Sequence, residues 1–249
     1  MEAIGLTLPI VREGDDLAGL ILRAATEEGL AIEDGDILVV TEKILAKAQG
    51  RVVRLDSVTP SEEARALARK TGKDPRLVEL ILSESREVLA AGDGFLITET
   101  LEGFVCANAG IDQSNVEEGF VKLLPEGPDK AAEEIRLEVE KRTGKKVGVV
   151  ISDSFGRPFR CGSVGVAIGA SGVKALWDRR GEADLYGRTL QSTRVAVGDL
   201  IASTANLVSG DADEKTPVVL IRGLKGLAGN GRGADLIRSR EQDMFRRKV

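Results

Sequence analysis

The sequence predicts a mixed α/β (α+β) fold, in which sheets with both parallel and antiparallel strands are flanked by helices. Three short runs rich in branched apolar residues, at 37–41, 147–151 and 217–221, have the length and composition of buried strands. Two further runs, 95–99 and 103–107, are joined by a short turn and predict an antiparallel hairpin. Because hairpins and helices interleave along the chain instead of alternating strictly, we expect a mixed sheet.

Length and composition set the scale of the molecule. The chain has 249 residues, which fits either one large domain or two modest ones. We take residues 1–249 as a single unit and keep two intertwined subdomains as the alternative. Aromatic residues make up only 3%, so the core must be built from Val, Ile, Leu and Ala.

The chain contains no histidine, although it has other side chains suited to catalysis. This excludes the commonest general base, the commonest zinc ligand and every nucleophile that depends on histidine. The net charge is -5 with interspersed signs, and no apolar run approaches the roughly 20 residues that span a bilayer. We therefore expect a cytoplasmic protein that binds neither nucleic acid nor membrane. Cys106 and Cys161 lack a C-x-x-C spacing, so we prefer reduced thiols and keep a disulfide as the alternative.

The N-terminal part of the chain predicts an extended segment followed by a helix. Residues 5–11 read as extended, but Pro9 interrupts them, so we place them at a sheet edge or in a loop. Asp15 or Asp16 caps a helix that ends near Gly29.

Two helices are predicted between the first strand and the hairpin. The segment Thr59-Pro60-Ser61-Glu62 has the pattern of a capping box with proline in the first turn, and its helix runs toward Thr71. Asp74-Pro75 starts a second helix, whose apolar residues extend to Val88. We interpret the pair as a helical insert that packs on the sheet.

The second half of the chain predicts three further helices. Pro128-Asp129 caps a helix over 130–143, which a glycine terminates. Apolar residues at helical spacing from Leu190 to Val208 predict a long helix. The glycine-rich stretch 223–233 is predicted to be flexible, and a helix over 234–247 closes the chain.

Two segments of the second half allow two interpretations each. Residues 165–172 carry regularly spaced glycines, which would let the backbone approach a ligand closely but also suit a buried strand or tight turn. The polar residues of 178–188 indicate a surface loop or an interface arm.

The central stretch 147–165 is the first candidate site. Its apolar strand ends abruptly in Ser152, Asp153 and Ser154, so a carboxylate and hydroxyls are expected at the end of the strand. Because Gly156 and Pro158 break any helix, we expect a loop after the strand, and Arg157 and Arg160 add two guanidinium groups to it. A carboxylate and arginines near a glycine indicate that the loop handles metal and phosphate.

A second acidic strand end lies at Asp112. It follows the strand 103–107, and two strands that each end in an aspartate supply what a divalent cation needs if the ends converge. An Asx-turn explains Asp112 at least as well. Lys43 and Lys47 are candidates for phosphate contacts, although a solvated charged face explains them about equally well.

Several long blocks of the sequence resemble the coenzyme F420:L-glutamate ligase (F420-0:gamma-glutamyl ligase) family, in the same order and over essentially the full chain. These blocks are GLTLPIVREGDDL, GDILVVTEKILAKAQGR, GFVCANAGIDQSNV, VGVVISDSFGRPFRCGSVGVAIG, DLYGRTL and TPVVLIRG. No Gly-x-x-x-x-Gly-Lys-Ser/Thr motif is present, so the nucleotide would not be bound by a P-loop.

The resemblance implies a GTP-dependent and divalent-metal-dependent amide ligase. Such an enzyme adds L-glutamate to the carboxylate of a deazaflavin coenzyme precursor and then adds further glutamates through γ-linkages. By resemblance, two Mg²⁺ or Mn²⁺ ions would be held by Asp112, Asp153, Ser154 and Asp211, with K⁺ as a further candidate cofactor. The guanine nucleotide would contact Leu8, Pro9, Ile10, Val11, Glu42, Lys43, Lys47, Asn115 and the 209–216 loop, within which we select Ser209, Gly210, Asp213 and Thr216.

This sequence departs from the family pattern at two of these positions. Asp211 stands where glutamate is expected, which shortens the reach of the carboxylate by one methylene. Ser154 stands where threonine is common, and it keeps the hydroxyl. We expect a homodimer from the resemblance, with the 178–188 arm as an interface element, and no fused reductase-like domain.

The implied mechanism follows from the poor reactivity of carboxylates. The acceptor carboxylate must first take the γ-phosphoryl group of GTP, and the glutamate amine then attacks the acyl phosphate. We assign Asp153, Lys47 and Arg157 to catalysis, because two metal ions with a lysine or arginine can offset the crowded negative charge. Arg157, Arg160 or Arg188 would bind the carboxylates of glutamate or the precursor's phosphodiester. The alternatives are another metal-dependent phosphoryl-transfer enzyme, such as a phosphatase, and a non-catalytic nucleotide-binding protein.

Overall fold

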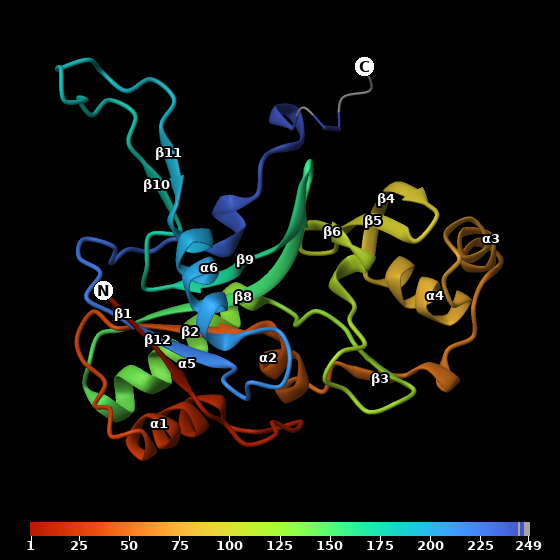
Figure 1. Ribbon diagram of the computed structural model, residues 1–249, viewed down its shortest axis with the longest axis horizontal. Coiled ribbons are helices and arrows are strands. Elements are labelled where there is room, and N and C mark those ends of the chain that lie inside the picture. Colours follow the sequence, from red (N-terminus) through yellow and green to blue (C-terminus); the bar gives the residue numbers. More distant parts are fainter. Residues whose placement is uncertain (244, 247–249) are drawn as a thin grey trace.

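A computed structural model describes residues 1–243 and 245–246, and its centre is a five-stranded mixed sheet (Figure 1). Strands β2 and β8 run parallel, whereas every other neighbouring pair is antiparallel, so the predicted mixed α/β fold is confirmed. In sheet order the strands are β1 (Glu2–Leu6), β12 (Val218–Arg222), β2 (Ile37–Thr41), β8 (Gly148–Arg157) and β9 (Arg160–Ser171).

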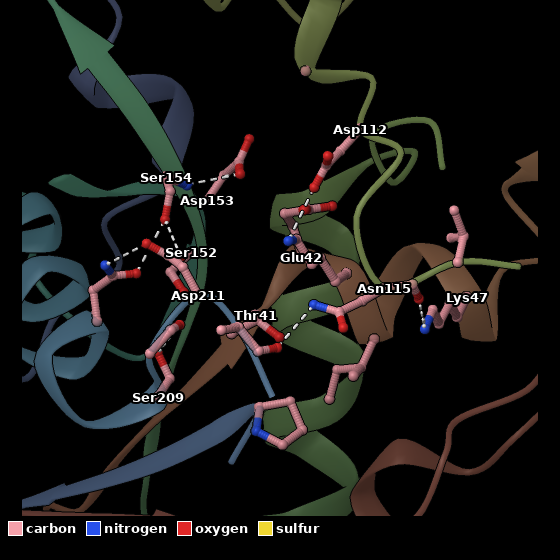
Figure 2. A pocket seen from close by; sticks show the side chains of 18 of the residues that line it. Thr41, Glu42, Lys47, Asp112, Asn115, Ser152, Asp153, Ser154, Ser209 and Asp211 are labelled. Carbon is pink, nitrogen blue, oxygen red and sulfur yellow. Dashed lines mark hydrogen bonds and ion pairs between the residues drawn. The ribbon is translucent and has the colours of Figure 1, made fainter. Parts of the chain in front are cut away.

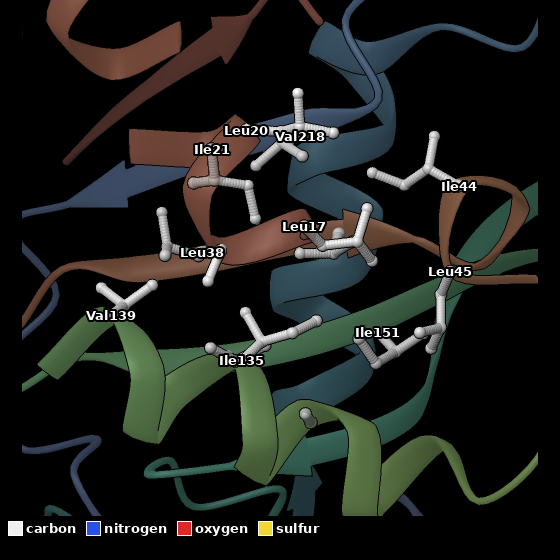
Figure 3. Packing of buried hydrophobic residues seen from close by; sticks show 14 of the residues in the cluster. Leu17, Leu20, Ile21, Leu38, Ile44, Leu45, Ile135, Val139, Ile151 and Val218 are labelled. Carbon is white, nitrogen blue, oxygen red and sulfur yellow. The ribbon is translucent and has the colours of Figure 1, made fainter. Parts of the chain in front are cut away.

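Helices cover both faces of this sheet. Helices α1 (Leu17–Glu27) and α5 (Pro128–Thr143) pack on one face, and α6 (Val197–Ser209) packs on the other. Strand β2 shows why: Leu38 and Val40 point into the first core cluster, while Ile37 and Val39 point into the second. Because both faces are buried, the strand reads as a continuous apolar run. Figure 3 shows the first cluster, which is built from aliphatic side chains as the composition predicted.

An insertion between β2 and α5 forms a second body of structure with its own apolar core. It starts after α2 (Glu42–Ala48) and carries the predicted hairpin, strands β5 and β6. Its elements are β3 (Val52–Arg54), η1 (Leu55–Ser57), α3 (Glu62–Thr71), α4 (Pro75–Ser83), β4 (Ser85–Gly92), β5 (Phe95–Thr100), β6 (Val105–Ala107), η2 (Asn108–Gly110) and β7 (Phe120–Lys122).

The polar segment 178–188 lies in an arm that projects from the body of the molecule (Figure 1). A short antiparallel ribbon of β10 (Leu176–Asp178) and β11 (Arg194–Ala196) forms its base. Leu185 and Tyr186 are highly exposed on the arm. Its role in a dimer interface stays a prediction.

Two predicted helix boundaries are wrong. The N-cap of α3 is Ser61, whose hydroxyl accepts a hydrogen bond from the amide of Ala64, so Thr59 and Pro60 precede the helix. Helix α6 begins at Val197, and Leu190 lies in the arm. For α6, the helical spacing of apolar residues continues N-terminal to the true helix start. Periodicity alone does not locate the start of a helix.

Strand β4 was missed by the sequence analysis, which assigned Val88 to a helix. Val88 pairs with Thr98 of β5 instead. The pairing contains bulges on the β4 side, and such irregularity blurs the alternation that would have indicated a strand.

The loop predicted after Ser154 is also wrong, because β8 continues to Arg157. Its partner β9 pairs antiparallel with it along its whole length, and only Pro158 and Phe159 form the turn. Gly156 is accommodated inside the strand. Asp153 therefore lies within a strand and not at its end.

Gly165 and Gly169 lie in β9 and serve packing, so the buried-strand interpretation holds for them, whereas Gly172 lies in a bend after the strand with a φ of 75°. A Cβ at Gly165 would collide with the backbone of Ala202 in α6. A Cβ at Gly169 would likewise meet the backbone of Pro128 in α5. Small residues let both helices approach the strand closely.

Gly165→Ala should lower the free energy of unfolding by about 1–3 kcal/mol, because the added methyl overpacks the contact with α6. Gly156→Ala is the matched control on the neighbouring strand, since a Cβ there meets nothing within 4 Å. Chemical denaturation of both variants checks the prediction, and equal stabilities would contradict it.

The C-terminal part differs from both predictions made for it. Residues 223–233, predicted to be flexible, are held against the chain after β9: the amide of Gly231 donates to the Val173 carbonyl at 2.8 Å and that of Lys174 to the Leu227 carbonyl at 2.7 Å. Instead of the helix predicted over 234–247, the described residues form two short turns, η3 (Gly233–Leu236) and η4 (Arg240–Gln242). Positions 244 and 247 of that predicted helix lie outside the described residues.

Two further expectations concern the thiols and the membrane. Cys106 is buried and Cys161 exposed, and both are free, as preferred. In the described part of the chain, no helix combines the length and apolar composition that a membrane crossing requires.

Arginines of the C-terminal segment hold Glu99 of β5. Arg240 Nη2 and Arg246 Nη1 each lie 2.5 Å from Glu99 Oε2. Burial acts to raise the pKa of Glu99, but the hydrogen bonds from Arg246 and Arg240 outweigh it, so the pKa lies below its ordinary value. The charged carboxylate therefore stabilises the fold at neutral pH.

Glu99→Gln should cost about 2 kcal/mol of unfolding free energy at neutral pH, where charge-assisted hydrogen bonds are lost. Because the folded-state pKa is lowered, the contribution is present above the ordinary pKa and disappears as the pH falls through the folded-state value. Melting temperatures of wild type and variant should therefore converge in acid. A constant difference across pH would contradict this.

Candidate functional site

A large cavity of about 1680 Å³ lies where the main sheet, α2, the end of α6 and the insertion meet. Seventeen of the residues predicted from the sequence for catalysis, nucleotide binding or metal binding line it. They are Leu8, Pro9, Ile10, Val11, Glu42, Lys43, Lys47, Asp112, Asn115, Asp153, Ser154, Arg157, Ser209, Gly210, Asp211, Asp213 and Thr216. Their individual roles stay predictions.

The parallel pair β2 and β8 explains why distant residues meet here. Thr41 at the end of β2 pairs with Ser152, so α2 begins beside Asp153. The carboxyl ends of parallel strands open at one edge of a sheet, where loops gather side chains. The α2 lysines, four positions apart, lie on one face of that helix.

Asp153 and Ser154 form one side of the cavity with residues that follow α6 (Figure 2). Asp153 Oδ1 accepts a hydrogen bond from the Ser154 amide at 2.7 Å. Burial raises the pKa of Asp153, and this effect outweighs the nearby positive charge of Lys122. The Ser154 hydroxyl lies 3.0 Å from Asp211 Oδ1 and 3.1 Å from Asn206 Oδ1.

Asn206 was not selected from the sequence. It lies in the last turn of α6, and its signal was its place just before the acidic loop that follows the helix. Its amide group contacts both Ser154 and Asp211, so a neutral oxygen atom lies beside them.

Asp112 faces the cavity from the other side (Figure 2). Its carboxylate accepts hydrogen bonds from the amide and hydroxyl of Ser114, which makes the Asx-turn considered from the sequence. It also forms an ion pair with Lys43 Nζ at 2.9 Å. Although burial acts to raise the pKa of Asp112, the hydrogen bonds from Ser114 and Lys43 lower it to about 2. This carboxylate is therefore charged at neutral pH.

Lys47 and Asn115 connect the insertion to the acidic loop. Lys47 Nζ donates to the Asn115 carbonyl at 2.6 Å, and Asn115 Nδ2 donates to the Ala212 carbonyl at 3.1 Å. Burial, followed by repulsion from Lys43, lowers the pKa of Lys47. The interpretation of Lys43 and Lys47 as a solvated face is therefore wrong, because both bind the 112–115 segment.

Under the cavity lies a buried ion pair that sequence reasoning missed. Lys122 Nζ is 2.6 Å from Glu42 Oε2, and both side chains are buried. Burial raises the pKa of Glu42 to about 8, and Lys122 opposes that shift. The backbone of Lys122 also exchanges two hydrogen bonds with that of Asp112. Its signal was a single lysine inside the apolar run FVKLL.

Of the three arginines predicted to bind anions, Arg157 alone lines the cavity among the described residues. Its Nη2 donates to the Cys161 carbonyl at 3.1 Å, while its buried Nε has no hydrogen-bond partner in the described structure. Arg160 is exposed near the hairpin turn, and Arg188 lies in the arm.

The oxygen atoms at the cavity suit a hard divalent cation in their chemistry. Within residues 1–243 and 245–246, no three Cys, Asp or Glu side chains are already gathered into a metal cluster. The donors instead face one another across the cavity: Asp112 on one side, and Asp153, Ser154 and Asp211 on the other. Carboxylate and hydroxyl oxygens are the ligands that Mg²⁺ and Mn²⁺ prefer. The donor set therefore fits Mg²⁺ or Mn²⁺ in its chemistry.

Sequence comparisons show relatives along nearly the whole chain. The family model of F420-0:Gamma-glutamyl ligase matches residues 5–223. The chain is 54% identical over 248 residues to the coenzyme F420:L-glutamate ligase of Methanocaldococcus jannaschii, covering 99% of this chain and 97% of the relative. It is 51% identical over 241 residues to the ligase of the same name from Methanothermobacter thermautotrophicus, covering 96% of each. The predicted resemblance is thereby confirmed, and the chain belongs to the F420-0:gamma-glutamyl ligase family.

Proposed function

We propose that this protein is a GTP-dependent coenzyme F420:L-glutamate ligase, which joins L-glutamate to the carboxylate of the deazaflavin precursor through an acyl phosphate. The observation that carries the proposal is that two sets of acids from distant segments face one cavity, together with two lysines and an arginine. Family membership supports the choice of acceptor and amino acid.

The first step transfers a phosphoryl group. An oxygen of the acceptor carboxylate attacks the γ-phosphorus of GTP, and the bond to the β-phosphate oxygen breaks to release GDP. Negative charge crowds between donor and acceptor, so cationic groups near the transferring group lower the barrier. Lys47 and Arg157 line the same cavity and are proposed for this role.

Asp112, Asp153, Ser154 and Asp211 are proposed to hold two Mg²⁺ or Mn²⁺ ions. When bound, such ions would supply the positive charge that offsets the phosphate oxygens. Asp112 is already ionised, and Asp153 lines the same cavity, so both side chains can face a cation. Asn206 is added to the proposed donors on the basis of its contact with Ser154.

The nucleotide is proposed to lie between the segment Leu8–Val11 and the loop 209–216. Both segments line the cavity, and the amide of Leu8 donates to the carbonyl of Lys215 at 3.3 Å, so they form one continuous wall. Glu42 faces the same space, but its carboxylate is turned to Lys122. We therefore propose that Glu42 supports this wall.

In the second step the amine of glutamate attacks the acyl carbon, the C–N bond forms and inorganic phosphate leaves. The amine must also lose a proton, for which the departing phosphate is an adequate base. We propose that the arm carrying Leu185 and Tyr186 contributes to a homodimer, which light scattering of the purified protein would test.

The test is incubation of the protein with GTP, Mg²⁺ or Mn²⁺, L-glutamate and the deglutamylated coenzyme. The ligase should form GDP and the glutamylated product together, as followed by chromatography and mass spectrometry, and should form neither without the acceptor. GTP loss without glutamate would favour a phosphatase. Nucleotide binding without turnover would favour a non-catalytic protein.

A further inference from the structure

One wall of the cavity is apolar and has no part in the arrangement described so far. Ile97 and Ala107 are direct cross-strand partners on β5 and β6, and Val105 lies two residues from Ala107 on the same face. All three line the cavity. We call this patch, made of Ile97, Val105 and Ala107, the apolar shelf.

The apolar shelf is exposed to the cavity and is not part of the insertion's core. Val105 is 41% exposed, whereas its neighbour Cys106 is buried. Glu99 continues the same face of the sheet as the direct partner of Val105, but Arg240 and Arg246 bind its carboxylate. Glu99, the carboxylate that continues this face of the sheet, is therefore already compensated by the two arginines.

The size of the cavity leaves room for a ligand on this shelf. A volume of about 1680 Å³ exceeds the roughly 300–1,000 Å³ that is usual for a single small ligand. Other residues that line the cavity, among them Lys43 and Lys47, are charged, and a triphosphate suits those groups better than it suits the shelf. Strand β6 packs against β8, so the shelf lies beside the strand that carries Asp153 and Arg157.

We propose that the apolar shelf binds the flat deazaflavin ring of the acceptor, and thereby directs its carboxylate toward the acids of β8. This inference rests on the proposed function. A planar apolar ring gains by covering aliphatic side chains that would otherwise face water. Arg157, on the neighbouring strand, lines the same cavity, and its guanidinium group suits an anionic group attached to such a ring. The competing occupant is the guanine base of GTP.

The experiment measures two affinities on each variant. Binding of the deglutamylated coenzyme is followed by the polarisation of its own fluorescence, and binding of GTP by calorimetry with Mg²⁺. Val105→Asp should weaken coenzyme binding roughly tenfold or more, because the carboxylate is placed against the ring, with GTP binding changed by less than about twofold. Leu101→Asp is the control, since Leu101 is an exposed aliphatic residue of the same insertion outside the cavity lining.

A milder variant guards against misfolding. Val105→Thr keeps the shape of the side chain and should weaken coenzyme binding by about threefold. Equal loss of GTP affinity in both Val105 variants would place the guanine base on the shelf and overturn the proposal, and so would unchanged coenzyme affinity in a folded variant. If the wild type bound no coenzyme, the proposed function itself would fail. If the wild type forms the glutamylated product and Val105→Asp binds the coenzyme with normal affinity, the role of the shelf is wrong but the proposed function stands.

Discussion

Asp153→Asn should abolish ligase turnover, lowering kcat by about a thousandfold or more, while the protein stays folded. Asp153 lies on the cavity wall beside Ser154, and asparagine keeps its size but removes the charge that would attract a cation. GDP release measured with all substrates present gives the rate. The binding of Mn²⁺, measured by calorimetry in the presence of GTP, should weaken in parallel.

The stability of this variant separates a functional acid from a structural one. Because burial raises the pKa of Asp153, the charged form costs folding free energy at pH values above the folded-state pKa. Without metal, Asp153→Asn should therefore melt at the same temperature as wild type or higher. Asp178→Asn is the control, since Asp178 pairs with Arg180 on the exposed arm, and it should retain full activity. Retained turnover in Asp153→Asn would remove this residue from the proposed site.

Lys122→Met should lower the free energy of unfolding by about 3–5 kcal/mol, the largest stability effect expected for a single substitution here. Lys122 and Glu42 are both buried and 2.6 Å apart, so the variant leaves a carboxyl group without its partner in a site from which water is excluded. Glu42, whose pKa burial already raises to about 8, must then hold its proton without a partner or unfold its surroundings. Guanidinium denaturation at neutral pH provides the measurement.

A double variant tests whether the cost comes from the orphaned acid. Glu42→Gln combined with Lys122→Met removes both charges and should recover most of the lost stability. Lys130→Met is the exposed counterpart, because Lys130 pairs with Glu134 on the surface of α5, and it should change stability by less than about 0.5 kcal/mol. A double variant as unstable as Lys122→Met alone would show that the lysine is needed for packing and not for its charge.

The sequence predicted those residues of the candidate site whose type is unusual for their position next to a predicted strand. Asp153 follows an apolar run, and Asp112 lies in a segment of amides and small residues. Both are conspicuous, because acidic side chains are rarely buried and those next to buried strands often have a functional role. Lys122 and Asn206 were not found. Each lies in a segment whose main signal is structural, an apolar strand in one case and a helix end in the other.

The errors in the fold have a common physical origin. The path of β8 beyond Ser154 depends on pairing with β9, and the order in the glycine-rich 223–233 segment depends on contacts with the residues that follow β9. Neither partner lies within the local window that periodicity and turn residues describe. The strand β4 was missed for the same reason, since its identity depends on β5.

The sequence by itself determined the mixed α/β class, most of the helices and strands, the absence of histidine chemistry and the family, because these depend on composition, local periodicity and long non-repetitive blocks. Only the tertiary structure decided that Asp112 and Asp153 face one cavity, that Lys43 already holds Asp112, and that an apolar shelf lies beside them. Those facts depend on the parallel register of β2 and β8 and on how the insertion packs against them. Long-range pairing of this kind is set by the free energy of the whole fold, so local sequence patterns do not predict it.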